Sequence, residues 1–208
     1  MENHKIKAVI FDLGNVLLDF DHRIAAGKIS PYTDKTPDDI FNLFFDSPLT
    51  RDFECGKISP EYFFSRIKQT LKLKIGYDKF VPIWNEIFFF SEKNRAVYDL
   101  AKRLNRNLTT GLLSNINVLH FEYLKKTFPV FDVFHKVMAS CELKVQKPDP
   151  FIFELAAQAL GVAFTEVFYT DDRPELVDGA RQLGIRAFVF QGVARLESDL
   201  KSQGVTIN

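Results

Sequence analysis

Short apolar runs of four to seven residues stand near the start of the chain and recur through its second half. Each run is too short for a helix and is rich in residues that favour β-structure, so each predicts a buried strand. The predicted strands cover residues 7–11, 108–113, 133–139, 167–170 and 186–190.

Longer segments with a helical spacing of apolar residues lie between the later strands. They cover residues 91–104, 118–127, 150–160 and 174–183. Ser91 is a suitable N-cap, Pro174 favours a first helical turn, and Gly161 is typical of a helix end. Helices and strands therefore alternate from residue 91 onward. This alternation predicts an α/β fold with a Rossmann-like parallel sheet and helices on both of its faces.

The alternation is interrupted between residues 20 and 90. This segment contains helical patterns at 37–45, 59–71 and 77–89 and no clear strand. It also holds 11 of the 22 phenylalanines and the single tryptophan, as expected for a helical bundle that buries an apolar face of its own. We therefore expect residues 1–19 and 91–208 to form an α/β core, with residues 20–90 as a small all-helical domain inserted after the first strand.

The composition and charge argue against several classes of protein. The chain has 208 residues with 27 basic and 27 acidic side chains, and it contains no basic block of the kind that binds nucleic acid. No apolar run approaches the roughly 20 residues of a membrane-spanning helix, and the first residues lack the apolar stretch of a secretory signal. Cys55 and Cys141 are interpreted as free, reduced thiols. We therefore expect a cytoplasmic protein that binds neither membranes nor nucleic acid. The sequence leaves its oligomeric state, monomer or homodimer, open.

Polar residues follow the predicted strands at the points where the strands end. In an open parallel sheet, ligands bind beyond these carboxyl ends, so the fold would bring residues distant in sequence together at one edge. Each residue alone is typical of a turn or a helix cap, and only their joint placement points to a site. The residues in question are Asp12, Ser114, Asn115, Lys147, Asp171 and Asp172.

This set of side chains supports a coherent phosphate chemistry. The carboxylates of Asp12, Asp171 and Asp172 are hard oxygen ligands of the kind that Mg²⁺ prefers. With a cation beside it, Asp12 can attack the phosphorus of an anionic substrate and form an aspartyl-phosphate. Ser114 can hold phosphate oxygens, and Lys147 can supply positive charge to the transition state while keeping Asp12 ionised.

Four stretches of the chain resemble the haloacid dehalogenase-like hydrolase superfamily, in the order in which that family carries them. They are residues 9–16 (VIFDLGNV), 112–115 (LLSN), 146–153 (QKPDPFIF) and 168–184 (FYTDDRPELVDGARQLG). The resemblance covers nearly the whole chain, and residues 20–90 stand where capped subfamily I members carry their helical cap. The segment DLGN is similar to the glucose-1-phosphate phosphatase-like branch.

The resemblance implies a role for each matching residue. It implies that Asp12 and Lys147 are catalytic, and that phosphate is bound by Ser114, Asn115 and Lys147. It also implies that Mg²⁺ is held by Asp12, Gly14, Asp171 and Asp172.

Two positions depart from the family pattern. The second acidic residue usual in the metal motif falls at Leu176, next to Glu175, and the pair Asp171-Asp172 can serve without it. The other departure bears on catalysis. Phosphatases of this family usually carry a second Asp two residues after the nucleophile as the general acid, and here that residue is Gly14. Loss of a general acid lowers the rate by about 10²–10⁴-fold for a poor leaving group, and it matters less for a good one such as an anomeric phosphate. Asp19, Asp21, His22 or a residue elsewhere in the helical insertion is an alternative source of the proton, although His22 is interpreted as part of a solvated loop.

The expected function is therefore Mg²⁺-dependent hydrolysis of a small phosphorylated metabolite, with a sugar phosphate as the expected substrate, through an aspartyl-phosphate. Two alternatives stay open. The same Asp12 can attack carbon in a 2-haloacid dehalogenase, a reaction that needs neither metal nor general acid. Alternatively, the absence of an acid at Gly14 is compatible with a weakly catalytic protein that binds a ligand or partner.

Overall fold

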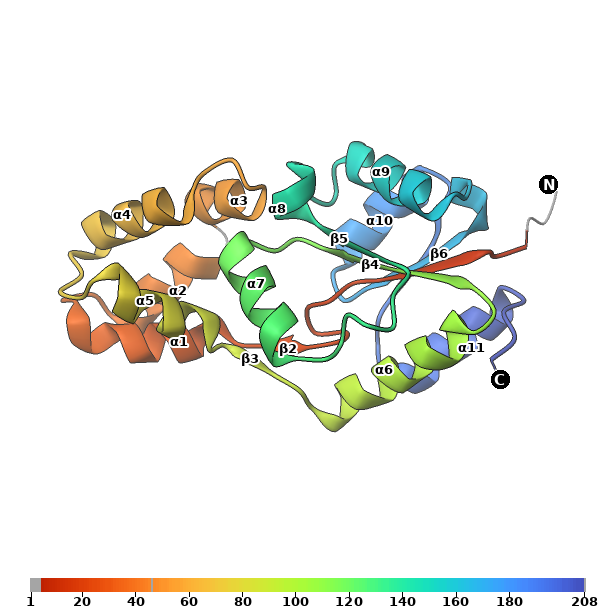
Figure 1. Ribbon diagram of the computed structural model, residues 1–208, viewed down its shortest axis with the longest axis horizontal. Helices are drawn as coiled ribbons and strands as arrows, with labels where there is room; N and C mark the ends of the chain where they lie inside the picture. The colour runs from red at the N-terminus through yellow and green to blue at the C-terminus, as the bar shows by residue number, and fades with distance from the viewer. Residues whose placement is uncertain (1–4, 46, 208) are drawn as a thin grey trace.

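A five-stranded parallel sheet forms the centre of the molecule (Figure 1). This computed structural model describes residues 5–45 and 47–207. In spatial order the strands are β5 (Lys136–Ala139), β4 (Thr109–Ser114), β1 (Ala8–Phe11), β6 (Val167–Asp171) and β7 (Arg186–Val189). Every neighbouring pair is parallel, which confirms the predicted sheet. The third strand starts later than expected, at Lys136 rather than residue 133, because residues before it form a turn.

Helices cover both faces of the sheet, as predicted. They are α6 (Glu92–Asn105), α7 (Val118–Thr127), α8 (Ser140–Leu143), α9 (Pro150–Leu160), α10 (Pro174–Gln182) and α11 (Val193–Ser202), with the short turn η2 (Phe164–Glu166) before β6. Alternate residues of β1 point to opposite faces: Val9 and Phe11 join a cluster with α6, α7 and α11, whereas Ala8 and Ile10 join one with α9 and α10. Figure 1 shows α9 and α10 on one side of the sheet and α6 and α11 on the other.

Residues between β1 and α6 form a separate group of helices. They are α1 (His22–Ile29), η1 (Ser30–Tyr32), α2 (Pro37–Phe45), α3 (Pro48–Glu54), α4 (Pro60–Leu71) and α5 (Tyr77–Asn85). Their apolar side chains form a third cluster, and its centre is the fully buried ring of Trp84. Phe44 and Phe63 lie 4.8 and 5.0 Å from that ring, centroid to centroid. The phenylalanine-rich composition of this segment is therefore explained by packing. Within the described ranges, no helix combines the length and apolar character needed to span a bilayer.

Several features of this segment differ from the sequence prediction, which contained neither α1 nor α3. The helix expected at 77–89 ends at Asn85, and Phe88–Phe89 instead forms β3, which pairs antiparallel with β2 (Asp19–Phe20). The run Ile87 to Phe90 is continuously apolar, so its spacing cannot distinguish strand from helix, and pairing with β2 decides.

The interpretation of His22 as a solvated loop residue is also wrong. His22 begins α1 and is only 8% exposed, and Asp21 caps this helix by accepting a hydrogen bond from the main-chain N–H of Arg23.

Candidate active site

Three carboxylates meet at the carboxyl edge of the sheet. Phe11 in β1 lies opposite Thr170 in β6, so the following residues, Asp12 and Asp171, are brought side by side. The main-chain N–H of Asp12 extends this pairing with a 3.0 Å hydrogen bond to the carbonyl of Thr170. Asp12, Asp171 and Asp172 each present a carboxylate oxygen within 4.8 Å of the others. The sequence prediction that these side chains share one edge of the sheet agrees with this geometry.

Lys147 lies between two of the carboxylates. Its Nζ atom donates to Asp12 Oδ1 and to Asp171 Oδ2, each at 2.6 Å, and to the carbonyl of Leu113 at 2.9 Å. The lysine is only 2% exposed. Burial acts to lower the pKa of Lys147, but the charges of Asp12 and Asp171 outweigh burial, and the pKa is raised. Lys147 is therefore a fixed positive charge at the centre of the site.

The three carboxylates have different electrostatic environments. Burial raises the pKa of Asp12 to about 7, and the negative charge of Asp171 adds to this effect while Lys147 opposes it. Burial also raises the pKa of Asp172, although a 2.9 Å hydrogen bond from Asn15 Nδ2 acts to lower it. The pKa of Asp171 is lowered despite burial, because Lys147, the hydroxyl of Tyr169 and the main-chain N–H of Arg173 all donate to it.

Three carboxylates meet here beside a single lysine, so in their ionised forms they carry more negative charge than Lys147 offsets. A divalent cation would relieve this repulsion, and the donors are the hard oxygens that suit Mg²⁺. Asp12 is 7% exposed and Asp172 is half-buried, so the cluster lies at the edge of the buried core. The donor set therefore fits magnesium.

Ser114 and Asn115 stand at the end of the neighbouring strand. Ser114 is the last residue of β4 and is 6% exposed. The amide of Asn115 contacts the main chain of Lys147 in both directions: Nδ2 donates to its carbonyl at 2.9 Å, and Oδ1 accepts from its N–H at 2.8 Å. Asn115 therefore fixes the backbone that carries the lysine, a contact that the sequence did not predict. Its expected role in phosphate binding stays a prediction, as does that of Ser114.

Gly14 lies beside the carboxylates with an aromatic ring against it. A Cβ atom on Gly14 would lie 3.8 Å from Asp12 Oδ2 and only 2.7 Å from Cε1 of Phe20. The position where the family usually has its acid is therefore adjacent to Asp12, and Phe20 fills the space that a side chain there would need. No sequence signal pointed to Phe20. The expected contact of the Gly14 main chain with a metal stays a prediction.

The three alternative proton donors have other partners in the structure. Asp19 accepts hydrogen bonds from Ser91 at 2.9 Å and from Asn94 at 3.3 Å, where the chain returns to the core. Asp21 caps α1. The His22 ring packs against Phe20, with centroids 5.4 Å apart.

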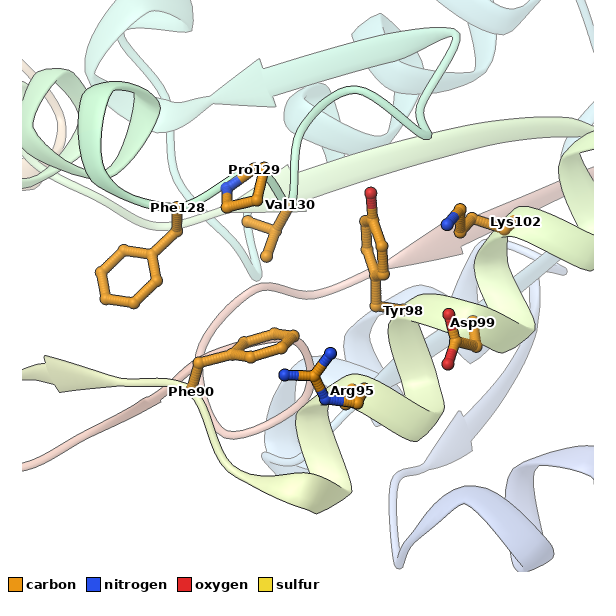
Figure 2. Close-up of a pocket in the computed structure, with 8 residues that line it drawn as sticks. All are labelled: Phe90, Arg95, Tyr98, Asp99, Lys102, Phe128, Pro129 and Val130. Atoms are coloured by element: carbon orange, nitrogen blue, oxygen red, sulfur yellow. The ribbon is translucent and has the colours of Figure 1, made fainter.

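A surface pocket of about 300 Å³ lies elsewhere, between α6 and the loop that follows α7 (Figure 2). Phe90, Tyr98 and Phe128 supply its aromatic walls, and Arg95 lies over the ring of Phe90 at 5.5 Å. None of the residues that line it belongs to the carboxylate cluster. The candidate active site is therefore identified by its charged groups and not by this pocket.

Comparison with known proteins agrees with the geometry. The family model described as haloacid dehalogenase-like hydrolase matches residues 6–184. Phosphatase MT3486 of Mycobacterium tuberculosis is 28% identical over 215 residues, which cover 98% of this chain and 97% of the relative. The D-ribitol-5-phosphate phosphatase of Bacteroides thetaiotaomicron is 24% identical over 189 residues, covering 88% of this chain and 91% of the relative.

A solved structure shares the fold closely. The HAD family enzyme BT-2542 of Bacteroides thetaiotaomicron, in complex with magnesium and inorganic phosphate, aligns with a TM-score of 0.77 and 26% identity. The alignment covers 88% of this chain and 93% of that one. Similarity therefore extends over nearly all of both chains.

Proposed function

The chain belongs to the haloacid dehalogenase-like hydrolase family and is a hydrolase, and from this premise we propose that it releases phosphate from a small phosphorylated metabolite with Mg²⁺ as its cofactor. The observation that carries the proposal is the arrangement of Asp12 and Asp171 on either side of Lys147, with Asp172 beside them. Relatives named as phosphatases, and a similar enzyme solved with magnesium and phosphate, support it.

Asp12, Asp171 and Asp172 are the side chains that would hold the metal, with the main chain of Gly14 as the further contact that we propose. When bound, magnesium supplies positive charge that offsets the repulsion between these carboxylates and an anionic phosphate. The same charge favours the ionised form of Asp12, whose pKa is otherwise raised to about 7 by burial.

Asp12 is the proposed nucleophile. Lys147 holds its Oδ1 atom at 2.6 Å, while Oδ2 lies on the side of Gly14. We propose that Asp12 attacks phosphorus, that the bond to the leaving oxygen breaks, and that water then hydrolyses the aspartyl-phosphate. Ser114 holds the phosphoryl oxygens in this proposal. Lys147 supplies positive charge, since its three N–H donors are already used by Asp12, Asp171 and the Leu113 carbonyl, and Asn115 keeps the Lys147 backbone in place.

The surroundings of Gly14 favour a substrate with a good leaving group. Glycine has no side chain that can protonate the departing oxygen, and Phe20 fills the space beside it. The anomeric oxygen of a sugar is a good leaving group that can depart before it is protonated, so it does not need a general acid. We therefore propose a sugar phosphate as the substrate class.

Residues 20–90 are proposed to act as a cap over this site. Their apolar side chains form a cluster of their own, and their first residue, Phe20, lies against Gly14. A cap in this position excludes bulk water while the aspartyl-phosphate forms.

The direct test is phosphate release from a panel of phosphorylated metabolites, with and without Mg²⁺. We expect release by the wild type only with Mg²⁺, and a loss of at least about 10³-fold in Asp12→Asn, because the nucleophile is removed. Asp132→Asn is the matched control, since Asp132 is an exposed carboxylate outside the cluster. Equal release by wild type and Asp12→Asn would refute the proposal. Halide release from a 2-haloacid without metal would favour the dehalogenase alternative instead.

A further inference from the structure

Residues 114–117 (the 114–117 loop) comprise the last residue of β4 and the loop that follows it, and they contact more than the candidate active site. Ser114 stands at the site, and Asn115 holds the backbone of Lys147. The next two residues, Ile116 and Asn117, connect to side chains of the core that reach into the helical insertion. Two separate hydrogen-bonded paths therefore lead from this short loop to residues 20–90.

The first path runs through Ser140, a fully buried residue at the start of α8. Its Oγ atom accepts a hydrogen bond from the main-chain N–H of Ile116 at 2.9 Å. The same hydroxyl donates to the main-chain carbonyl of Glu54, at the end of α3, at 2.6 Å. One hydroxyl thus joins the loop directly to the insertion.

The insertion approaches α8 closely at this point. Gly56 follows α3 with a φ of +61°, and a Cβ atom there would lie 2.3 Å from the carbonyl oxygen of Cys141. Lys144 Nζ donates to the carbonyl of Gly56 at 2.9 Å. The backbone after α3 therefore rests directly on the core, in a conformation that glycine permits.

The second path runs through His120 on α7. Asn117 caps this helix by accepting from the His120 N–H at 3.0 Å, and its Nδ2 lies 3.0 Å from the His120 Nδ1 atom. The His120 Nε2 atom lies 2.9 Å from the main-chain carbonyl of Trp84 in α5. An amide nitrogen only donates and a carbonyl only accepts, so His120 is neutral, with its proton on Nε2.

The ring of His120 also stacks on the insertion. Its centroid lies 4.8 Å from that of Trp84, with an angle of 14° between the planes. Burial lowers the pKa of His120 to about 3, which keeps the neutral form that this contact requires. In both paths, a core side chain bonded to the loop donates to a main-chain carbonyl of the insertion.

We propose that Ser140 and His120 are positioning residues that couple phosphate binding at the 114–117 loop to docking of the helical insertion. The inference rests on the proposed function, since it takes Ser114 to be a phosphate contact. A phosphate that orders the loop strengthens the two paths, and a docked insertion in turn orders the loop for phosphate. This coupling is reciprocal by thermodynamic linkage.

The test uses inorganic phosphate, in the presence of Mg²⁺, as the probe. The variants are Ser140→Ala, His120→Phe, which keeps a ring beside Trp84, and the double variant. By the usual strength of a hydrogen bond, each single change weakens phosphate binding by about 3- to 10-fold, and the double change by about 10- to 100-fold. The affinity for Mg²⁺ alone stays within about twofold of wild type, because the metal cluster is untouched. Calorimetry measures both affinities.

Hydrogen exchange supplies a readout that a merely structural role would not move. In the wild type, phosphate is expected to protect amides of α3 and α5, the two helices that the paths reach, and the double variant is expected to lose this protection. Trp84 is the single tryptophan of the chain, so its fluorescence also reports the response of the insertion to phosphate. This readout suits Ser140→Ala, because that variant leaves His120 stacked on Trp84. His120→Gln retains an N–H donor. We expect it to recover at least half of the phosphate affinity that His120→Phe loses, measured on a logarithmic scale.

The outcomes separate this inference from the proposed function. If the wild type binds and releases phosphate but α3 and α5 gain no protection, the coupling is refuted and the phosphatase proposal stands. Variants that melt at a lower temperature yet keep wild-type phosphate affinity and protection also refute the coupling, because their role is then structural. If the wild type neither releases nor binds phosphate, both proposals fail.

Discussion

Lys147 determines the charge balance of the site at the scale of single residues. It is almost fully buried and contacts Asp12 and Asp171 at the same distance, 2.6 Å. A buried ion pair adds little net stability, because desolvation offsets the attraction, but removal of one partner leaves an uncompensated charge. The lysine is therefore important chiefly because its charge lies between two carboxylates that would otherwise repel: it lowers the pKa of Asp171 despite burial and limits the rise in the pKa of Asp12.

The contact between Gly14 and Phe20 yields a prediction at this scale. In Gly14→Ala the new Cβ atom lies 2.7 Å from Phe20 Cε1, so the ring must move. We expect a loss of about 1–3 kcal/mol in the free energy of unfolding, typical of overpacking. In Gly14→Ala with Phe20→Leu, the second change removes the clash, and the combined loss is smaller than the sum of the single losses. Urea unfolding of all four proteins measures the coupling, and strictly additive losses would contradict the steric account.

His120 yields a pH-dependent prediction. Its pKa is about 3 in the folded protein because of burial, against about 6.5 in an unfolded chain. Between these values the unfolded state binds one more proton, so the stability of the wild type falls as the pH falls, by about 1.4 kcal/mol per unit from this residue. His120→Phe lacks this contribution.

The destabilisation by His120→Phe relative to wild type should therefore shrink by about 2 kcal/mol between pH 7 and pH 5. Urea unfolding at the two pH values gives the comparison. Because only the difference between two proteins is used, the titration of His22 and of the site carboxylates largely cancels. An unchanged difference at both pH values would show that His120 is not held in its neutral form.

At the scale of elements, local signals located the helices of the core well. The predicted limits of α7 and α9 agree with the structure, and Ser91 is the N-cap of α6 in a capping box with Asn94. These limits depend on side chains that satisfy backbone groups a few residues away, so the information is local. The pairing of β2 with β3 joins residues that are far apart in sequence, and no local pattern encodes it. The burial of His22 likewise depends on rings from other elements, including Trp84 and Phe45.

Two exposed glycines give an element-scale prediction with a built-in control. Gly161 ends α9 with a φ of +67°, whereas Gly27 lies within α1, and a Cβ atom on either would meet no atom within 4 Å. Gly161→Ala should lower the free energy of unfolding by about 1 kcal/mol, because alanine is strained in the left-handed region. Gly27→Ala should raise it by about 0.5–1 kcal/mol, because alanine favours the helix. Urea unfolding checks both signs, and effects of the same sign would refute the argument.

At the scale of the whole molecule, the sheet turns separated residues into one site. Four chain segments supply the carboxylates, Lys147 and Ser114, and their positions after predicted parallel strands were enough to predict that the carboxylates meet. Side-chain contacts made to these residues from outside the strand ends were not predictable. Phe20 reaches Gly14 from the insertion, and the Asn115 amide holds Lys147 from another loop, because both depend on side-chain orientation in the assembled fold.

Magnesium binding should stabilise the whole chain against unfolding. A ligand that binds only the folded state stabilises it by RT ln(1 + [L]/Kd), or about 2.7 kcal/mol at 100 times Kd. For a domain of this size each kcal/mol raises the melting temperature by about 2–4 °C, so saturating Mg²⁺ should raise it by about 5–11 °C.

In Asp172→Asn, one of the three carboxylates that would hold the metal becomes a weaker neutral donor, so we expect less than half of this shift. Asp132→Asn, an equal change at an exposed carboxylate, should retain it in full. Thermal melts of the three proteins, with Mg²⁺ and with EDTA, decide the matter: an equal shift in all three would place the metal elsewhere. No shift in any of them would instead mean that Mg²⁺ does not bind the folded protein at Asp12, Asp171 and Asp172.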